Sequence, residues 1–187
     1  HEAGFSDPLV ECKKCGTRMR QDKMKDMSKC DNCGSTDITE PRAYQLMMGL
    51  SIVATSDGAV NAYLRPETAT TTYTNFKNVL DAKPHKLPFG IAQIGKSFRN
   101  EISPRGFVFR MREFEQAEMQ YFVNPADDEK YHQMWMETRM AWWIDVLGIP
   151  ANKLRFLPHE KLAHYAKAAV DIEYEFPDGF DEVEGIH

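Results

Sequence analysis

The sequence predicts an α+β fold, in which an antiparallel β-sheet is flanked by helices and carries a zinc ribbon. Two Cys-x2-Cys pairs lie near the N-terminus, and residues 124–148 carry the signals of one long helix. Residues 170–176 alternate apolar and acidic side chains, which is typical of a strand in an antiparallel sheet with one solvated face. We therefore expect one sheet, backed by the long helix, with the ribbon at its edge.

Composition and charge narrow the possible classes of function. The 187 residues are 42% hydrophobic and 27% charged, which suffices for a folded domain. The net charge of −5 gives no overall attraction to nucleic acid, so any anion site must be local. No apolar run reaches the roughly 18 residues that a membrane helix needs, and a secretion signal is missing, so we expect a cytoplasmic protein without a membrane partner. The sequence starts without Met and ends within an alternating pattern, so we also expect a fragment.

All four cysteines fall into the pairs Cys12-x2-Cys15 and Cys30-x2-Cys33, and a glycine follows each pair. This spacing is typical of a tetrahedral zinc site, where glycine can take the positive φ that turns backbone amides toward a thiolate. Two disulfides or free thiols are the alternatives, and the expected reducing compartment disfavours disulfides. Four thiolates leave no open coordination position, so the predicted Zn²⁺ is structural. We place the ribbon and the segment before it in residues 1–41.

The elements between the ribbon and residue 98 are less sharply marked. Residues 42–54 are apolar and fit either a strand or a buried helix. A turn is expected at Ser56-Asp57-Gly58, followed by a strand that ends near Pro66. A short helix is expected from Thr68, although its threonines oppose it by up to about 0.7 kcal/mol each. Its spacing signal comes from Tyr73, Phe76, Val79 and Leu80.

The clearest helix spans residues 124–148. Asn124 is a good N-cap, Pro125 suits the first helical position, and Gly148 closes the helix. A second helix is predicted over residues 159–169, immediately before the alternating strand at residues 170–176. The stripe of the first helix that should pack on the sheet comprises Tyr131, Met134, Trp135, Thr138, Trp142 and Val146.

Residues 96–122 combine a local positive charge with strand-like alternation. A turn at residues 103–106 is expected to lead into a strand whose one face suits a phosphate, a flat base and an ammonium group, in that order. A surface hairpin with cross-strand ion pairs is the alternative. That face carries Arg110, Arg112, Phe114, Gln116 and Glu118. Up to residue 112 the only acid is Glu101, against Lys96, Arg99, Arg105, Arg110 and Arg112.

Several of these segments resemble the class II aminoacyl-tRNA synthetases. The segments "FRNEISPR" and "FRMREFEQAEMQYF" are together similar to motif 2 of that class. In the dimeric, bacterial-type glycyl-tRNA synthetases, counterparts occur in this order of "YLRPETA", "KLPFGIAQIGKSFRNEI", "HEKLAHYAKAAVDIEYEF" and "GFDEVEGIH". The resemblance covers nearly the whole chain, including the zinc-type insertion. It implies a sheet of the class II synthetase type, with residues 42–187 forming part of the catalytic core.

The resemblance also implies a chemistry. The enzymes of this family are ligases of protein biosynthesis that activate glycine with ATP and Mg²⁺. They form glycyl-adenylate and pass the glycyl group to tRNA(Gly), and the full-length enzymes are homodimers. The partners implied for this chain are therefore glycine, ATP and tRNA(Gly).

The same resemblance assigns roles to six residues. Arg99 matches the catalytic motif 2 arginine that holds the α-phosphate of ATP and the carboxylate of glycine. The other ATP-binding matches are Glu101 at the adenine edge, Arg110 on the ATP, and Phe114 stacked on adenine. Carboxylates that receive the ammonium group of glycine are matched by Glu67 and Glu118.

Three points keep other functions open. Thr70 to Tyr73 stand where the family has Gln-Gly-Ile-Phe, which puts the helix beside Glu67 in question. Motifs 1 and 3 would lie outside these residues, so activity of this chain alone and its oligomeric state do not follow. A non-catalytic synthetase-like module is one alternative.

The other alternative is a zinc-ribbon nucleic-acid-binding protein, which the basic residues near the cysteines favour, although a solvated basic face explains them more simply. These basic residues are Lys13, Lys14, Arg18, Arg20, Lys23, Lys25 and Lys29. The histidines show no metal-ligand spacing among themselves, and we interpret them as structural or surface residues. They are His1, His85, His132, His159, His164 and His187.

Overall fold

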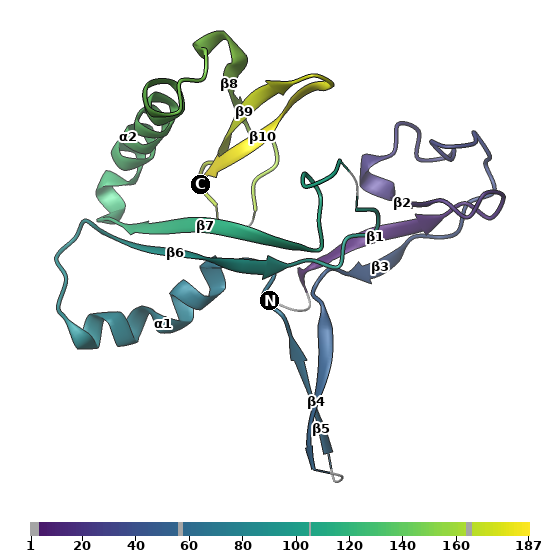
Figure 1. Ribbon diagram of the computed structural model, residues 1–187, viewed down its shortest axis with the longest axis horizontal. Coiled ribbons are helices and arrows are strands. Elements are labelled where there is room, and N and C mark those ends of the chain that lie inside the picture. The colour runs from purple at the N-terminus through teal and green to yellow at the C-terminus, as the bar shows by residue number, and fades with distance from the viewer. Residues whose placement is uncertain (1–3, 56–57, 105, 164–165) are drawn as a thin grey trace. The chain divides into compact units, whose positions relative to one another are not determined.

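The computed structural model describes residues 4–55, 58–104, 106–163 and 166–187 (Figure 1). The chain divides into two compact units, a first unit of His1–His85 with Gly90–Tyr121 and a second unit of Lys86–Phe89 with Phe122–His187. The described strands form four small sheets, and the strands of three of them pair antiparallel. The antiparallel arrangement agrees with the sequence prediction, but the expected single sheet is divided among four sheets.

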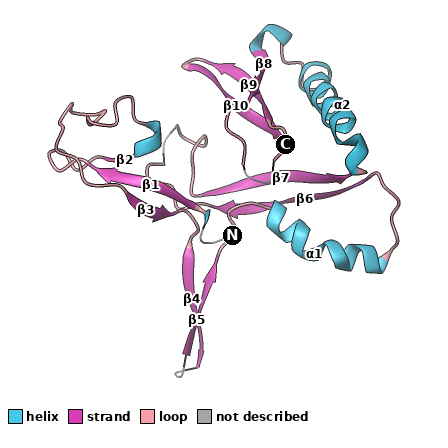
Figure 2. Cartoon of the chain, turned by 180° about the vertical axis from the view of Figure 1, so that it is seen from behind, coloured by secondary structure: helices cyan, strands magenta, loops and turns pink. Residues whose placement is uncertain are grey.

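The first unit begins with a three-stranded sheet in the order β2-β1-β3. Its strands are β1 (Ser6–Glu11), β2 (Arg18–Arg20) and β3 (Arg42–Gln45), and a 3₁₀ turn, η2 (Gln21–Lys23), follows β2. Leu9 and Val10 on β1 are buried. The chain between η2 and β3 is loop (Figure 2), apart from an isolated antiparallel bridge between Ile38 and Cys12.

The strands β4 (Gly49–Thr55) and β5 (Gly58–Tyr63) form an antiparallel two-stranded hairpin. Residues 42–54 are therefore divided between two strands, and the alternative of a buried helix is wrong. β5 ends at Tyr63, earlier than the predicted end near Pro66. Residues 56–57 of the predicted turn lie outside the described residues.

The predicted helix after Thr68 is confirmed as α1 (Ala69–Ala82). Threonines lower its intrinsic stability, but their hydroxyls bind the neighbouring strand β6. The Oγ1 atoms of Thr71 and Thr72 both donate to Gln93 Oε1, at 2.7 and 3.4 Å. The unusual residues at 70–73 therefore do not prevent a helix beside Glu67, because tertiary hydrogen bonds offset their low propensity.

The strands β6 (Phe89–Phe98) and β7 (Glu113–Phe122) form the second two-stranded sheet. The prediction that Arg110 and Arg112 belong to this strand is wrong. β7 starts only at Glu113, and both arginines lie in the preceding loop. Gly106 and Phe107 have positive φ values of 70° and 55°, which turn the backbone out of the extended conformation. From residue 114 the alternation agrees with prediction, since Phe114, Gln116 and Glu118 are half-buried and their neighbours exposed. Arg105, which belongs to the predicted turn, lies outside the described residues.

The long helix of the second unit is confirmed as three consecutive helical pieces. They are η3 (Pro125–Asp127), α2 (Asp128–Ala141) and the π-turn η4 (Trp142–Val146). Asn124 caps the helix as predicted, because its side chain accepts from the Ala126 amide (3.1 Å). Gly148, with a φ of 69°, follows its end.

The second unit packs this helix on the three-stranded sheet β10-β9-β8 (Figure 1). The strands are β8 (Leu154–Pro158), β9 (Val170–Phe176) and β10 (Gly179–Ile186), and a 3₁₀ turn, η5 (Ala151–Lys153), precedes β8. The predicted helix stripe is only partly right, since Val146 is 67% exposed. The core-facing side is displaced already within α2, where Met136 and Met140 pack against the core and Thr138 is exposed. The same side continues through Trp143 and Ile144. The buried core consists of Leu154, Val170, Ile172 and Ile186, packed by Trp135, Met136, Met140, Trp143 and Ile144.

Two predictions for the end of the chain are corrected. The helix expected over residues 159–169 is absent from residues 159–163 and 166–169, because the His159 amide donates to the Ala169 carbonyl (3.0 Å) and prolongs the β8–β9 ladder. The strand at residues 170–176 is confirmed, but its acidic face is not solvated. Asp171 and Glu173 are each 7% exposed and pair with His159 and Arg155, both at 2.6 Å.

Neither α1 nor α2, the two α-helices of the described residues, combines the length and hydrophobicity that a membrane crossing would require.

Candidate active site and cysteine cluster

The four cysteines come together at the end of the β1–β2–β3 sheet. Their Sγ atoms all lie within 4.8 Å of one another, and the pairs Cys12–Cys33 and Cys15–Cys30 are 3.6 and 3.7 Å apart. A tetrahedral zinc site with Zn–S bonds of about 2.3 Å has sulfur–sulfur edges of about 3.8 Å. The cluster therefore has the dimensions and the donor chemistry of a four-cysteine zinc site, and all four cysteines are free of disulfides.

Each cysteine pair is built as the same tight turn. The Gly16 amide donates to the Cys12 carbonyl and the Gly34 amide to the Cys30 carbonyl, both at 2.8 Å. These glycines have φ values of 70° and 69°, a conformation that other residues adopt only with strain. The sequence therefore places glycine where this turn needs it.

Several basic residues around the cysteines are engaged in ion pairs within the first unit. Lys13 pairs with Asp37 at 3.4 Å, and Arg20 pairs with Asp7 at 2.9 Å. Two further pairs are Arg18–Glu11 at 3.1 Å and Lys29–Asp26 at 3.6 Å. Charges neutralised in this way are less available to a phosphate backbone, which supports the solvated-face interpretation of this surface.

A second cluster lies where β6, β7 and the segment before α1 meet, and Arg99 is its cation. Arg99 Nε donates to the Pro66 carbonyl (3.1 Å). Its guanidinium carbon lies 5.4 Å from the centre of the Phe114 ring and 5.8 Å from that of Phe5. The Arg99 amide donates to the Arg112 carbonyl (2.9 Å), which closes the base of the loop between β6 and β7.

Two carboxylates, Glu67 and Glu118, accompany Arg99. Burial raises the pKa of Glu67, the charge of Glu118 raises it further, and the charge of Arg99 lowers it. Glu67 also accepts a hydrogen bond from Thr70 Oγ1 (3.5 Å), and Glu118 accepts one from Thr68 Oγ1. Residues far apart in the sequence thus form one electrostatic site of two carboxylates and a guanidinium.

The remaining predicted residues lie around this cluster in different ways. Phe114 presents its ring to Arg99, as described above. The Glu101 carbonyl accepts from Arg112 Nε and Nη2, at 3.4 and 3.3 Å, and its carboxylate lies within electrostatic reach of Asp7 and Arg20. In the part of the chain that the structure describes, no hydrogen bond or ion pair joins Arg110 to the cluster.

Sequence reasoning missed the neutral residues that support the carboxylates. Gln116 Oε1 accepts from the Thr68 amide and from Ser97 Oγ, both at 3.1 Å. Gln93 Oε1 accepts from Thr71 and Thr72. The strand alternation placed Gln116 on the same face as Phe114 and Glu118, so this signal was present, whereas nothing in the sequence pointed to Ser97.

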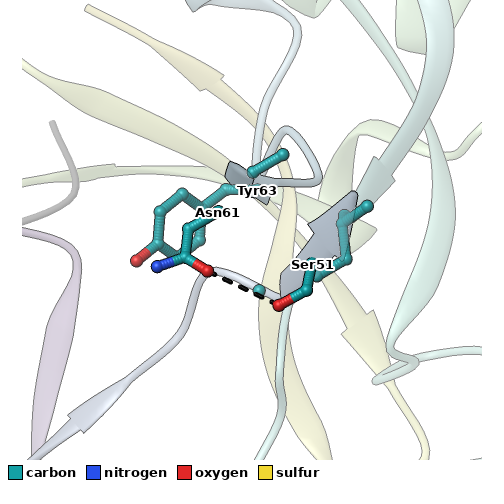
Figure 3. Close-up of a pocket in the computed structure, with 6 residues that line it drawn as sticks. Ser51, Asn61 and Tyr63 are labelled. Atoms are coloured by element: carbon teal, nitrogen blue, oxygen red, sulfur yellow. Dashed lines mark hydrogen bonds between the residues drawn. The ribbon is translucent and has the colours of Figure 1, made fainter. Parts of the chain in front are cut away.

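A surface hollow lies elsewhere, on the β4–β5 hairpin (Figure 3). It measures about 380 Å³ and contains none of the predicted site residues. Ser51 Oγ donates to Asn61 Oδ1 across it (3.5 Å), beside Tyr63. A two-stranded hairpin offers only a shallow, open surface. The hollow is lined by uncharged residues, so we assign it no chemistry. Its lining residues are Gly49, Leu50, Ser51, Asn61, Ala62 and Tyr63.

Comparison with known proteins places this architecture in a family. Residues 53–184, more than two thirds of the chain, match the family described as tRNA synthetase class II core domain (G, H, P, S and T). The chain belongs to this class II synthetase family. The matched residues include α1, β6 and β7, and also Glu67, Arg99, Phe114 and Glu118.

Individual class II synthetases give a finer comparison. Over the whole chain, identity is 48% with a glycine–tRNA ligase of Borrelia hermsii and 48% with one of Treponema denticola. Over 80% of the chain it is 55% with a glycine–tRNA ligase of Thermus thermophilus, of which 30% is covered. The chain spans about two fifths of the first two relatives, 43% and 42% of their lengths.

Proposed function

We propose that this chain is the core of a glycine–tRNA ligase and that the Arg99 cluster is where glycine is activated. The observation that carries the proposal is the convergence of Glu67, Glu118 and Arg99 on one site of the class II core. Two carboxylates suit an ammonium group, and a guanidinium suits a phosphate or carboxylate. Glycine and the α-phosphate of ATP together present these groups. The names of the relatives support the same substrate.

In the proposed reaction, a carboxylate oxygen of glycine attacks the α-phosphorus of ATP. The bond from this phosphorus to the oxygen that bridges to the β-phosphate breaks, and pyrophosphate leaves with that oxygen and its negative charge. Arg99 would hold the α-phosphate and the glycine carboxylate in line, so its charge lies where the transition state gains negative charge. Glu67 and Glu118 would hold the ammonium group at the other end of glycine.

ATP would be bound by the residues around Arg99. Phe114 would stack on adenine with the ring face that Arg99 leaves open, Glu101 would contact the adenine edge, and Arg110 would reach the phosphates from its loop. Mg²⁺, which neutralises phosphate charge during transfer, would be held chiefly by ATP itself. Transfer of the glycyl group to tRNA(Gly), a homodimeric full-length protein and a cytoplasmic location belong to the same proposal.

We also propose that the four cysteines bind a structural Zn²⁺. Residues 1–41 would then be the zinc ribbon with its preceding segment, and residues 42–187 a partial catalytic core. The sulfur spacings and the paired glycine turns support this assignment. With all four positions taken by thiolates, the metal would stabilise the ribbon and take no part in catalysis.

Glycine-dependent exchange of pyrophosphate into ATP tests the main proposal. The assay should use the full-length protein that contains this sequence, with alanine and serine as competing amino acids and Glu118→Ala as the inactive variant. We expect exchange with glycine alone, lost in the variant. Absent exchange would refute the proposal and leave a non-catalytic synthetase-like module. Exchange that is equal with alanine would refute glycine as the specific substrate.

A further inference from the structure

The side chain of Thr68 is fully buried beside the candidate glycine pocket. A buried hydroxyl requires a hydrogen-bond partner, and its single proton can serve only one strong acceptor. Thr68 donates this proton to Glu118 Oε2. One of the two proposed ammonium-binding carboxylates is thus held by a neutral, buried donor.

The backbone of Thr68 is held as firmly as its side chain. Its amide donates to Gln116 Oε1, and the buried Ser97 Oγ donates to the same oxygen, both at 3.1 Å. Ser97 lies on β6, Gln116 on β7, and Thr68 immediately before α1. The Ser97–Gln116–Thr68 chain of hydrogen bonds therefore fixes three elements relative to one another inside the first unit.

We propose that Thr68 is a positioning residue that sets the width of the glycine pocket and thereby excludes larger amino acids. This inference rests on the proposed glycine activation. Thr68 follows Glu67 directly in the chain and bonds Glu118 through its hydroxyl, so one residue controls the separation of both carboxylates.

The physical need for such a residue comes from the substrate. Glycine differs from alanine by one methyl group, and a flexible pocket discriminates against one methyl by only about 10- to 200-fold. Long carboxylate side chains are flexible, because they can change rotamer easily. A buried hydroxyl that holds Glu118 from a backbone position beside Glu67 removes this freedom.

The test compares three variants in the full-length protein that contains this sequence. Thr68→Val keeps the shape and removes the hydroxyl, and Thr68→Ser restores the hydroxyl without the methyl. The matched control is Thr74→Val on the exposed side of α1, where the hydroxyl donates to the Thr71 carbonyl (3.1 Å). Each protein is assayed for pyrophosphate exchange with glycine, with alanine, and with varied ATP.

For Thr68→Val we expect the KM for glycine to rise about 10- to 100-fold, the range for losing a hydrogen bond to a charged group. The KM for ATP should stay within about threefold, and the ratio of kcat/KM for glycine over alanine should fall at least tenfold. Thr68→Ser should recover most of both effects, and Thr74→Val should resemble the wild type. Because KM and this ratio do not depend on the folded fraction, they remain informative if Thr68→Val is less stable.

Three results would overturn the inference. An unchanged ratio of glycine to alanine in Thr68→Val would show that Thr68 does not set selectivity. Equal losses in Thr68→Val and Thr68→Ser, or equal rises in the KM for glycine and ATP, would indicate a general structural role. A wild-type protein without glycine-dependent exchange would refute the proposed function itself, and the inference with it.

Discussion

Carboxylates are held in opposite ways in the second unit and in the candidate site of the first unit. In the second unit they meet basic side chains, with Glu173 on Arg155 at 2.6 Å and Glu175 on Lys153 at 2.5 Å. In the candidate site of the first unit, a threonine hydroxyl holds Glu118, while Arg99 donates to a carbonyl and lies against aromatic rings. Among the described residues neither Glu118 nor Arg99 forms an ion pair.

Under the proposed function, the difference separates a structural use of charge from a binding use. A carboxylate neutralised by a neighbouring base contributes to folding but has little attraction left for a ligand. A carboxylate held by neutral dipoles is oriented and keeps its charge, which is what an ammonium or phosphate partner requires. The contrast therefore predicts that substitutions in the two units will have different consequences.

The largest expected effect concerns the cysteine cluster, where thiolate charge should be neutralised by metal. Cys30→Ser should reduce bound zinc from about one equivalent per chain to none and unfold the ribbon, since structural zinc supplies folding energy directly. Elemental analysis and circular dichroism measure both. Met27→Ser, which changes an exposed side chain of the same loop, is the control. Zinc retained by Cys30→Ser would contradict the four-cysteine site.

Arg99→Ala should lower glycine-dependent pyrophosphate exchange by about 10²- to 10³-fold, the usual loss when one donor to developing charge is removed. The control is Arg155→Ala, which removes an arginine already engaged with Glu173. Its rate should stay within a few-fold of wild type. Similar losses of rate in both variants would break the distinction between the two units.

A pair of matched carboxylate substitutions sharpens the comparison. Glu118→Gln should raise the KM for glycine about 10- to 100-fold with little change in the melting temperature. Glu173→Gln should leave this KM unchanged and lower the melting temperature by several degrees, because it removes the partner of Arg155 and costs about 1 kcal/mol after allowance for solvent exposure. Thermal unfolding and exchange kinetics on the same preparations decide the matter.

The smallest expected effect is a pH dependence from Glu67. Its pKa in the folded chain is raised by burial and by Glu118, so the folded state binds the proton more tightly than the unfolded state does. This contribution to stability is complete below the ordinary glutamate pKa and is lost as pH rises through the raised value. The free energy of unfolding, measured with urea from pH 4 to 7, should fall less steeply with pH in Glu67→Gln than in the wild type. The same dependence of this free energy on pH in both proteins would contradict the raised pKa.

Much of this chain could be predicted because its strongest signals are local. The Asn124 cap and the cysteine spacing depend on neighbours within a few residues, and the alternation that placed Phe114, Gln116 and Glu118 on one face holds wherever β7 begins. The predicted helix over residues 159–169 failed because a long-range ladder bond from His159 to Ala169 outweighed local propensity. The acidic face of β9 was misjudged because its basic partners lie on another strand.

The candidate site was predictable only in part. Strand alternation already marked Glu118 as a binding carboxylate, and the roles of Glu67 and Arg99 came from the resemblance to the class II synthetases. The hydrogen bonds of Thr68 and Ser97 depend on tertiary placement that no spacing reveals. The prediction places Arg110 and Arg112 on a strand, because alternation alone cannot show where a strand starts. The positive φ values at Gly106 and Phe107 turn the backbone out of the extended conformation, and β7 starts only at Glu113.

Binding of a non-hydrolysable glycyl-adenylate analogue, measured by calorimetry, tests most directly whether the charges of the first unit are kept for a ligand. We predict one analogue per chain for the wild type, at least 100-fold weaker binding for Arg99→Ala, and unchanged affinity for Glu173→Gln. Wild-type protein that does not bind the analogue, or Arg99→Ala that binds it equally well, would contradict the assignment of this cluster as the site of glycine activation.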